Sequence, residues 1–203
     1  MEIYQLYELF KQSTGVTTDT RNIKQNQLFF ALKGDSFNGN TFAEKALEIG
    51  ASYSIIDEKE FQQNEKCIFV SDVLSTLQQL ANYHLHQINP KHILAITGSN
   101  GKTTTKELVN AVLSTTYKTH YTKGNLNNHI GIPLTLLEMQ ENTEIAIIEM
   151  GANHQKEIES YCQYVEPTHG IITNCGKAHL EGFGGIEGIQ KGKGELYDYL
   201  KTH

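Results

Sequence analysis

The sequence lacks the features that mark secreted and membrane-spanning proteins. Its only cysteines, Cys67, Cys162 and Cys175, are far apart and include no C-x-x-C pair. We therefore expect neither a disulfide framework nor a zinc site. No apolar stretch approaches the length that crosses a bilayer, and Glu2 stands where a signal peptide would carry basic residues. These absences favour a cytoplasmic protein without membrane insertion.

Excess positive charge is also missing. Lysine and arginine number 17 against 23 aspartates and glutamates, which gives a net charge of −6, and no block of like charges occurs along the chain. We therefore expect no nucleic-acid partner, although the composition still allows a local site that binds a small anion. With 203 residues, of which 38% are hydrophobic, the chain is long enough to bury one or two cores.

The apolar pattern predicts a first domain at residues 1–88. Strand patterns and helical spacing alternate along it, and Gly50 follows the first helix as a good stop signal. The predicted elements are strands at 27–32, 53–56 and 67–70 and helices at 42–49 and 73–88.

A second domain is predicted at residues 89–203, because Asn89-Pro90 disfavours a continuing helix and a strand pattern begins just beyond it. We expect strands at 92–97, 144–149 and 170–173, an extended segment at 117–122, and helices near 103–115, after Pro133 and at 195–203. Alternating strands and helices favour an α/β fold with a mostly parallel sheet covered on both faces.

The last segments suggest that the domain is incomplete. A glycine-rich stretch spans 182–194, and the helix predicted after it stops before any returning strand. The second sheet has fewer strands than such domains usually contain. We therefore expect a piece of a longer protein.

The strongest local motif is TGSNGKTT, between the strand at 92–97 and the following helix. Backbone amides of such a loop, together with the helix N-terminus, can enclose phosphates. The alternative interpretation is a plain glycine turn. The motif is a shortened G-x-x-G-K-T, because Ile96 occupies the position of the first glycine in the usual G-x-x-x-x-G-K-[ST] pattern. The candidate nucleotide-binding residues are Gly98, Ser99, Asn100, Gly101, Lys102, Thr103 and Thr104.

Further polar residues follow the other predicted strands. Glu149 ends one strand and can face the phosphate loop to hold Mg²⁺, the alternative being a solvated carboxylate. His179 follows the next strand, where a lone histidine is more often simply exposed. Lys191 and Lys193 would by default be solvated, and residue type alone assigns them no chemistry.

An amide-rich loop precedes Pro133. Asn125, Asn127 and Asn128 could bind sugar hydroxyls and peptide amides, because asparagine both donates and accepts hydrogen bonds. A turn-rich connector is an equally good interpretation of this loop.

Several segments, in order, closely resemble the Mur ligases, and the resemblance covers essentially the whole chain. They are TTDTR, LFFALKG and FNGNTF in the first domain, and TGSNGKTT, TKGNLNNHIGIPLTLL, IIEMGANHQKEI and ITNCGKAHLEGFG in the second. The resemblance implies a small N-terminal α/β domain that binds a UDP-substrate, followed by part of a P-loop-type ATPase domain. The GNLNNH segment and the TDTR-to-ALKG pattern favour the member that joins D-alanyl-D-alanine to UDP-N-acetylmuramoyl-tripeptide over its sister ligases and folylpolyglutamate synthase.

The resemblance implies an ATP- and Mg²⁺-dependent reaction in peptidoglycan precursor synthesis, in which the substrate carboxylate becomes an acyl phosphate that the amine then displaces. It assigns Lys102 to the phosphates, Thr103 and Glu149 to one Mg²⁺, and His179 to a second. It also implies a lysine carbamylated by CO₂, which maps to Lys193, with Lys191 as the alternative.

The resemblance implies two substrate-binding groups as well. Residues near the UDP moiety would be Asp19, Arg21, Lys33, Asn38 and Asn40, and those near the muramoyl-peptide Asn125, Asn127 and Asn128.

The family continues beyond the position of His203 with the rest of the ATPase sheet and a C-terminal Rossmann-like domain. We therefore expect this chain to be a monomeric N-terminal fragment with little or no ligase activity. The alternatives are a UDP-muramoyl-peptide-binding module without catalysis and another member of the family. A generic P-loop kinase or GTPase is disfavoured, since the chain has no N-K-x-D guanine signature.

Overall fold

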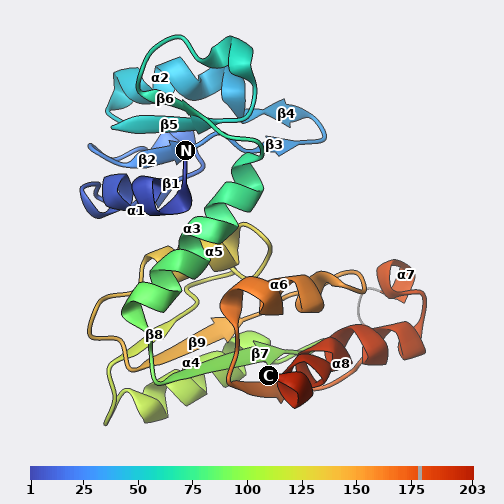
Figure 1. Cartoon of the computed structure of the whole chain (residues 1–203). Coiled ribbons are helices and arrows are strands. Elements are labelled where there is room, and N and C mark those ends of the chain that lie inside the picture. The colour runs from blue at the N-terminus through green and yellow to red at the C-terminus, as the bar shows by residue number, and fades with distance from the viewer. Residues whose placement is uncertain (178–179) are drawn as a thin grey trace. The chain divides into compact units, whose positions relative to one another are not determined.

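The structure is a computed structural model that describes residues 1–177 and 180–203 (Figure 1). It divides into two compact units, Met1–His84 and Leu85–His203. The division falls inside helix α3 (Val73–Ile88), whereas the sequence places it at the end of that helix. Both units are α/β and built on parallel sheets, so the predicted fold class is confirmed. No helix of the described residues is long and apolar enough to span a bilayer.

The first unit contains a four-stranded sheet in the order β1-β2-β5-β6, with every neighbouring pair parallel. A short antiparallel pair, β3-β4, lies apart from it. The elements are α1 (Ile3–Lys11), β1 (Val16–Thr17), η1 (Thr20–Asn22), β2 (Leu28–Phe30), β3 (Lys33–Gly34), β4 (Phe37–Asn38), η2 (Gly39–Phe42), α2 (Ala43–Ile49), β5 (Tyr53–Ile56), η3 (Lys59–Phe61), β6 (Cys67–Phe69) and the start of α3.

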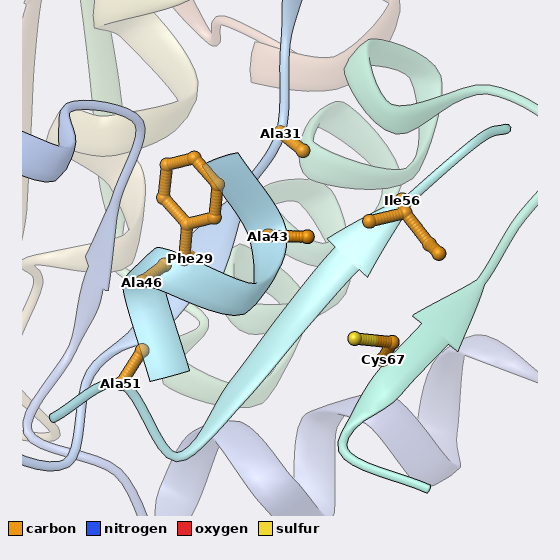
Figure 2. Close-up of a cluster of buried hydrophobic side chains, with 7 residues drawn as sticks. All are labelled: Phe29, Ala31, Ala43, Ala46, Ala51, Ile56 and Cys67. Carbon is orange, nitrogen blue, oxygen red and sulfur yellow. The ribbon is translucent and has the colours of Figure 1, made fainter. Parts of the chain in front are cut away.

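Small side chains let α2 pack closely on this sheet. Figure 2 shows the cluster formed by Phe29, Ala31, Ala43, Ala46, Ala51, Ile56 and Cys67. Leu28 and Phe30 alternate with Phe29 along β2 and therefore point to the opposite face, where both are fully buried. Both faces of the sheet are thus covered, which explains why these strands are continuously apolar.

Helix α1 was not predicted from the sequence. Leu6, Tyr7 and Phe10 are its buried residues, and the Tyr7 hydroxyl lies 3.1 Å from His84 Nδ1 on α3. Ile3, Leu6, Tyr7 and Phe10 recur at helical spacing, so the sequence does contain an apolar face for this helix that the prediction left unassigned.

The second unit contains a parallel sheet in the order β10-β7-β9-β8. Ile96 and Ile147 point towards Val109 of α4, whereas Gly170 packs against Leu196 of α8, so helices cover both faces. The elements are β7 (His92–Thr97), α4 (Lys102–Leu113), β8 (Thr119–Tyr121), α5 (Gly131–Leu137), β9 (Ile145–Glu149), α6 (Glu157–Val165), β10 (His169–Ile172), α7 (Leu180–Phe183) and α8 (Ile186–Thr202).

Four helices of this unit differ from the prediction. Helix α5 begins before Pro133, which fits the first turn because amides there need no intrahelical partner. Helix α8 begins at Ile186, nine residues before the predicted start, and includes most of the glycine-rich stretch. A Cβ on Gly192 would lie 2.5 Å from a ring atom of Phe183, so close packing requires glycine there. Helices α6 and α7 were not predicted.

Candidate functional site

The glycine loop joins the end of β7 to the start of α4, as predicted. Gly98 and Gly101 have φ of +139° and +79°, in a region that L side chains rarely adopt. A Cβ on Gly98 would also overlap the Thr173 hydroxyl. The loop therefore needs glycine at both positions, for backbone conformation at Gly101 and for conformation and space at Gly98.

The segment after β10 holds the loop in shape. The Ser99 amide donates to the Asn174 carbonyl at 3.0 Å. The Asn100 carbonyl accepts from the Thr173 hydroxyl at 2.6 Å and from the Asn174 amide group at 3.0 Å. Sequence reasoning missed Thr173 and Asn174, whose only signal was their position directly after a predicted strand.

Lys102 opens α4 and folds back over the loop. Its ammonium donates to the Gly98 carbonyl at 2.8 Å and lies 3.4 Å from the Ser99 carbonyl. Thr104 is exposed in the same first helical turn. A flexible cation beside free helix amides can bind a phosphate chain.

Glu149 ends β9 beside this helix and is 1% exposed. The Thr103 hydroxyl donates to its carboxylate at 3.0 Å, and the Asn127 side chain donates at 2.8 Å. The Glu149 amide donates to the Thr122 hydroxyl at 3.0 Å, which fixes the backbone as well. The predicted meeting of Glu149 with the phosphate loop therefore occurs at the carboxyl ends of neighbouring strands.

A hard divalent cation suits this pair of residues. The Thr103 hydroxyl and the Glu149 carboxylate are adjacent oxygen donors, the type that Mg²⁺ prefers. Among the described residues, no group of three or more histidines, cysteines, aspartates or glutamates is placed to hold a metal. A cation here would therefore complete its coordination with ligand oxygens or water. His179, expected at a second metal, lies outside the described residues.

Lys193 is buried in the middle of α8, whereas Lys191 is exposed. Its ammonium donates to the Ala152 carbonyl at 3.1 Å and lies 4.9 Å from the centre of the Phe183 ring. Burial, reinforced by the positive charge of Lys102, lowers the pKa of Lys193 to about 8. This amine is therefore neutral more often than a surface lysine at the same pH.

The three asparagines of the amide-rich loop have different surroundings. Asn127 donates to Glu149, as described, and Asn128 accepts from the Gly131 amide at 2.8 Å, at the start of α5. Asn125 is exposed, with no side-chain hydrogen bond recorded within the described part of the chain. The loop thus supports the carboxylate and a helix, and leaves Asn125 open to solvent.

In the first unit, Asp19 and Arg21 pair with each other. The guanidinium donates to both carboxylate oxygens, at 2.9 Å and 2.6 Å, and this pairing lowers the pKa of Asp19 to about 2. Both residues are on or beside η1, and the arginine is exposed.

A second polar network connects β3 and β4 to the end of β5. Lys33 pairs with Asp57 at 3.1 Å, and the Asn38 amide donates to Glu58 at 2.8 Å. Asn40 is fully buried, and its amide group donates to Asp57 at 2.9 Å. Asn40 therefore supports this network from inside, whereas Lys33 remains partly exposed.

The strand, glycine loop and helix N-terminus, with a carboxylate at the end of the adjacent strand, define the second unit as a P-loop-type α/β domain. Comparison with known protein families is more specific. Residues 96–203 match the Mur ligase middle domain, and residues 12–100 match the Mur ligase family catalytic domain. The chain belongs to the Mur ligase family.

Curated relatives share much of the sequence. The UDP-N-acetylmuramoyl-tripeptide--D-alanyl-D-alanine ligase of Bacillus subtilis is 46% identical over 189 residues, which cover 92% of this chain and 41% of the relative. The corresponding ligase of Escherichia coli is 40% identical over 185 residues, covering 91% of this chain and 40% of the relative. The chain thus spans about 40% of the length of these relatives.

Solved structures agree with the fold. A crystal structure of MurF from Acinetobacter baumannii has a TM-score of 0.86 at 34% identity, covering 98% of this chain and 46% of that one. MurF ligase from Thermotoga maritima, solved in complex with ADP, has a TM-score of 0.85 at 31% identity, covering 96% and 44%.

Proposed function

We propose that this chain supplies the UDP-substrate-binding and nucleotide-binding parts of an ATP-dependent ligase. The ligase would join D-alanyl-D-alanine to UDP-N-acetylmuramoyl-tripeptide in peptidoglycan precursor synthesis. The observation that carries the proposal is the contact between Thr103, in the first turn after the glycine loop, and Glu149. The names of the relatives indicate which substrates to test.

Phosphate binding would begin at the glycine loop. The amides of the first turn of α4, which have no intrahelical acceptor, and the Lys102 ammonium would bind anionic oxygens, and Lys102 must leave the Gly98 carbonyl to do so. Thr103 and Glu149 would hold Mg²⁺, which, when bound, neutralises charge on the phosphate oxygens. Catalysis of this kind is mostly positioning and charge neutralisation.

The reaction would proceed in two steps. The tripeptide carboxylate attacks the γ-phosphorus, and the bond to ADP breaks, so that an acyl phosphate forms. The amine of D-alanyl-D-alanine then attacks the acyl carbon, loses a proton and displaces inorganic phosphate. Lys102, next to the loop, would offset negative charge on the transferred group.

Lys193 would take part as a carbamate. A neutral amine is required to add CO₂, and the lowered pKa of Lys193 favours that form. Carbamylation replaces a cation by an anion with two oxygens, which a second Mg²⁺ requires. His179 would be the other protein ligand of that ion. Lys191, being exposed, has no such environment.

UDP would contact the first unit near Asp19, Arg21, Lys33 and Asn38, with Asn40 supporting them. The muramoyl-peptide would meet Asn125 and Asn128 of the amide-rich loop. A binding module for UDP-muramoyl-peptide without catalysis is the second candidate, which the polar groups of the first unit would serve equally well.

The first test is binding of Mg-ADP by calorimetry, comparing the chain with its Lys102→Met variant. We expect saturable binding that the substitution weakens at least roughly tenfold, since a cation–phosphate contact is lost. Equal binding by both proteins would contradict the role of the loop.

The second test measures phosphate release from Mg-ATP with UDP-N-acetylmuramoyl-tripeptide present and D-alanyl-D-alanine added or withheld. Release that requires both substrates would establish the ligase. Substrate binding without release, in this chain and in one extended to the length of its relatives, would favour the binding module.

A further inference from the structure

Helix α4 has one fully buried side chain, and it is a lysine. Lys106 is 0% exposed, at the helix position where spacing from Val109 and Leu113 predicts an apolar residue facing the sheet. Lysine is almost never fully buried without a charged partner. This position therefore calls for an explanation beyond packing.

Two carboxylates lie within ion-pair distance of the Lys106 ammonium. Glu149 Oε2 is 3.8 Å away and 1% exposed, whereas Glu107 Oε1 is 3.1 Å away on a half-exposed side chain. The Tyr121 ring centre lies 5.7 Å away. Among the described residues the ammonium makes no hydrogen bond of acceptable geometry, so charge is its main interaction.

Lys106 follows Thr103 by one helical turn, so both side chains reach the Glu149 carboxylate from α4. Thr103 reaches it from the loop end, where a divalent cation would bind. Lys106 lies further along the helix, in the protein interior. The carboxylate is thus between a candidate metal position and the buried Lys106 side chain.

We propose that Lys106 is a positioning residue that acts as the counter-charge of Glu149 and restricts binding of free Mg²⁺. The ammonium offsets the carboxylate when no metal is bound, so that the buried charge is tolerated. The same ammonium repels a bare divalent ion. A metal ion bound to a nucleotide can still bind, because the negative phosphates offset the repulsion by Lys106. The inference rests on the proposed function of the loop.

The pairing is tested by a double-mutant cycle of Lys106→Met and Glu149→Gln in the full 203-residue chain without metal. Methionine keeps the length of the side chain and removes its charge. We expect Lys106→Met alone to lower the melting temperature by roughly 10 °C, because a buried carboxylate loses its partner. In the Glu149→Gln background we expect no loss, or a rise in melting temperature, because the lysine there is a buried charge without that partner. An equal loss in both backgrounds, or none in either, would overturn the proposal.

The metal effect is tested with MgCl₂ alone, without nucleotide. We expect Lys106→Met to bind Mg²⁺ at least roughly tenfold more tightly than the original chain, and Lys106→Arg to resemble the original. Unchanged or weaker Mg²⁺ binding in Lys106→Met would overturn the proposal. If that variant is unfolded without metal, folding restored by MgCl₂ supports the proposal, and failure to fold in MgCl₂ overturns it.

Glu107→Gln provides the matched control. It removes the exposed carboxylate next to Lys106, and we expect a melting temperature within about 2 °C of the original, because exposed pairs contribute little. Mg-ADP binding by the original chain distinguishes the counter-charge role of Lys106 from the proposed nucleotide-binding function. Tighter Mg²⁺ binding by Lys106→Met without any Mg-ADP binding would support the counter-charge and refute the nucleotide-binding function.

Discussion

Replacing Gly98 by alanine tests the packing of the phosphate loop most directly. Its φ of +139° is strained for any L residue, at about 1–3 kcal/mol. The new Cβ would also overlap Thr173 Oγ1 and lie 3.1 Å from the Asn174 amide nitrogen. Moving Thr173 aside would weaken its 2.6 Å hydrogen bond to the Asn100 carbonyl, at about 1 kcal/mol. We therefore expect a loss of about 2–4 kcal/mol in the free energy of unfolding.

Gly101→Ala is the matched control for this substitution. Gly101 also has a positive φ, +79°, but a Cβ there meets nothing within 4 Å. Only backbone strain remains, about 1–2 kcal/mol. The difference between the two variants therefore reports the contact with the segment after β10, together with any extra backbone strain at the φ of Gly98.

Calorimetry measures the unfolding of both variants. The unfolding transition whose temperature Mg-ADP changes is assigned to the second unit. We expect Gly98→Ala to be more destabilising than Gly101→Ala by about 1–2 kcal/mol. Equal losses, or a larger loss in Gly101→Ala, would show that the loop is not packed against Thr173.

Three further substitutions test other parts of the structure. Between pH 8 and 9 the unfolded chain keeps Lys193 protonated while the folded chain releases its proton, so stability rises with pH by at most about 1.4 kcal/mol per unit. We expect the Lys193→Met substitution to remove this rise when denaturation is measured in CO₂-free buffer. An unchanged dependence of stability on pH would contradict the lowered pKa of Lys193. Asn127→Ala should weaken Mg-ADP binding roughly tenfold in calorimetry, because Glu149 loses a 2.8 Å hydrogen bond, and undiminished affinity would count against this support. Asn40→Ala should destabilise the first unit by about 2–4 kcal/mol, since buried partners of its amide lose their hydrogen bonds, and a loss below about 1 kcal/mol in thermal denaturation would refute that role.

The sequence predicted the features that depend on neighbouring residues. The glycine loop was recognisable because a strand, two glycines and a helix follow one another within a short segment. Glu149 could be placed beside it because parallel strands end at the same edge of a sheet. Helices α2 and α3 have clear apolar spacing and good stop signals, and their bounds were nearly correct.

Features that depend on distant contacts were missed. Thr173 and Asn100 are 73 residues apart, and nothing in either local sequence specifies their hydrogen bond. The early start of α8 was missed because glycine disfavours helices locally, although contact with Phe183 requires it at Gly192. Lys106, in contrast, is recognisable from the sequence as a charged residue at an apolar position, because helical spacing places it on the face of α4 shared by Val109 and Leu113.

The phosphate loop depends on neighbouring segments for its conformation. Three of its backbone groups, the Ser99 and Asn100 amides and the Asn100 carbonyl, bond to residues after β10. Strand β10 in turn packs under α8, where Leu196 fills the space above Gly170. Helix α8 also carries Lys193. The conformation of the phosphate loop and the position of Lys193 are therefore set by the same strand and helix, so a change in the packing of β10 against α8 would alter both sides of the site together.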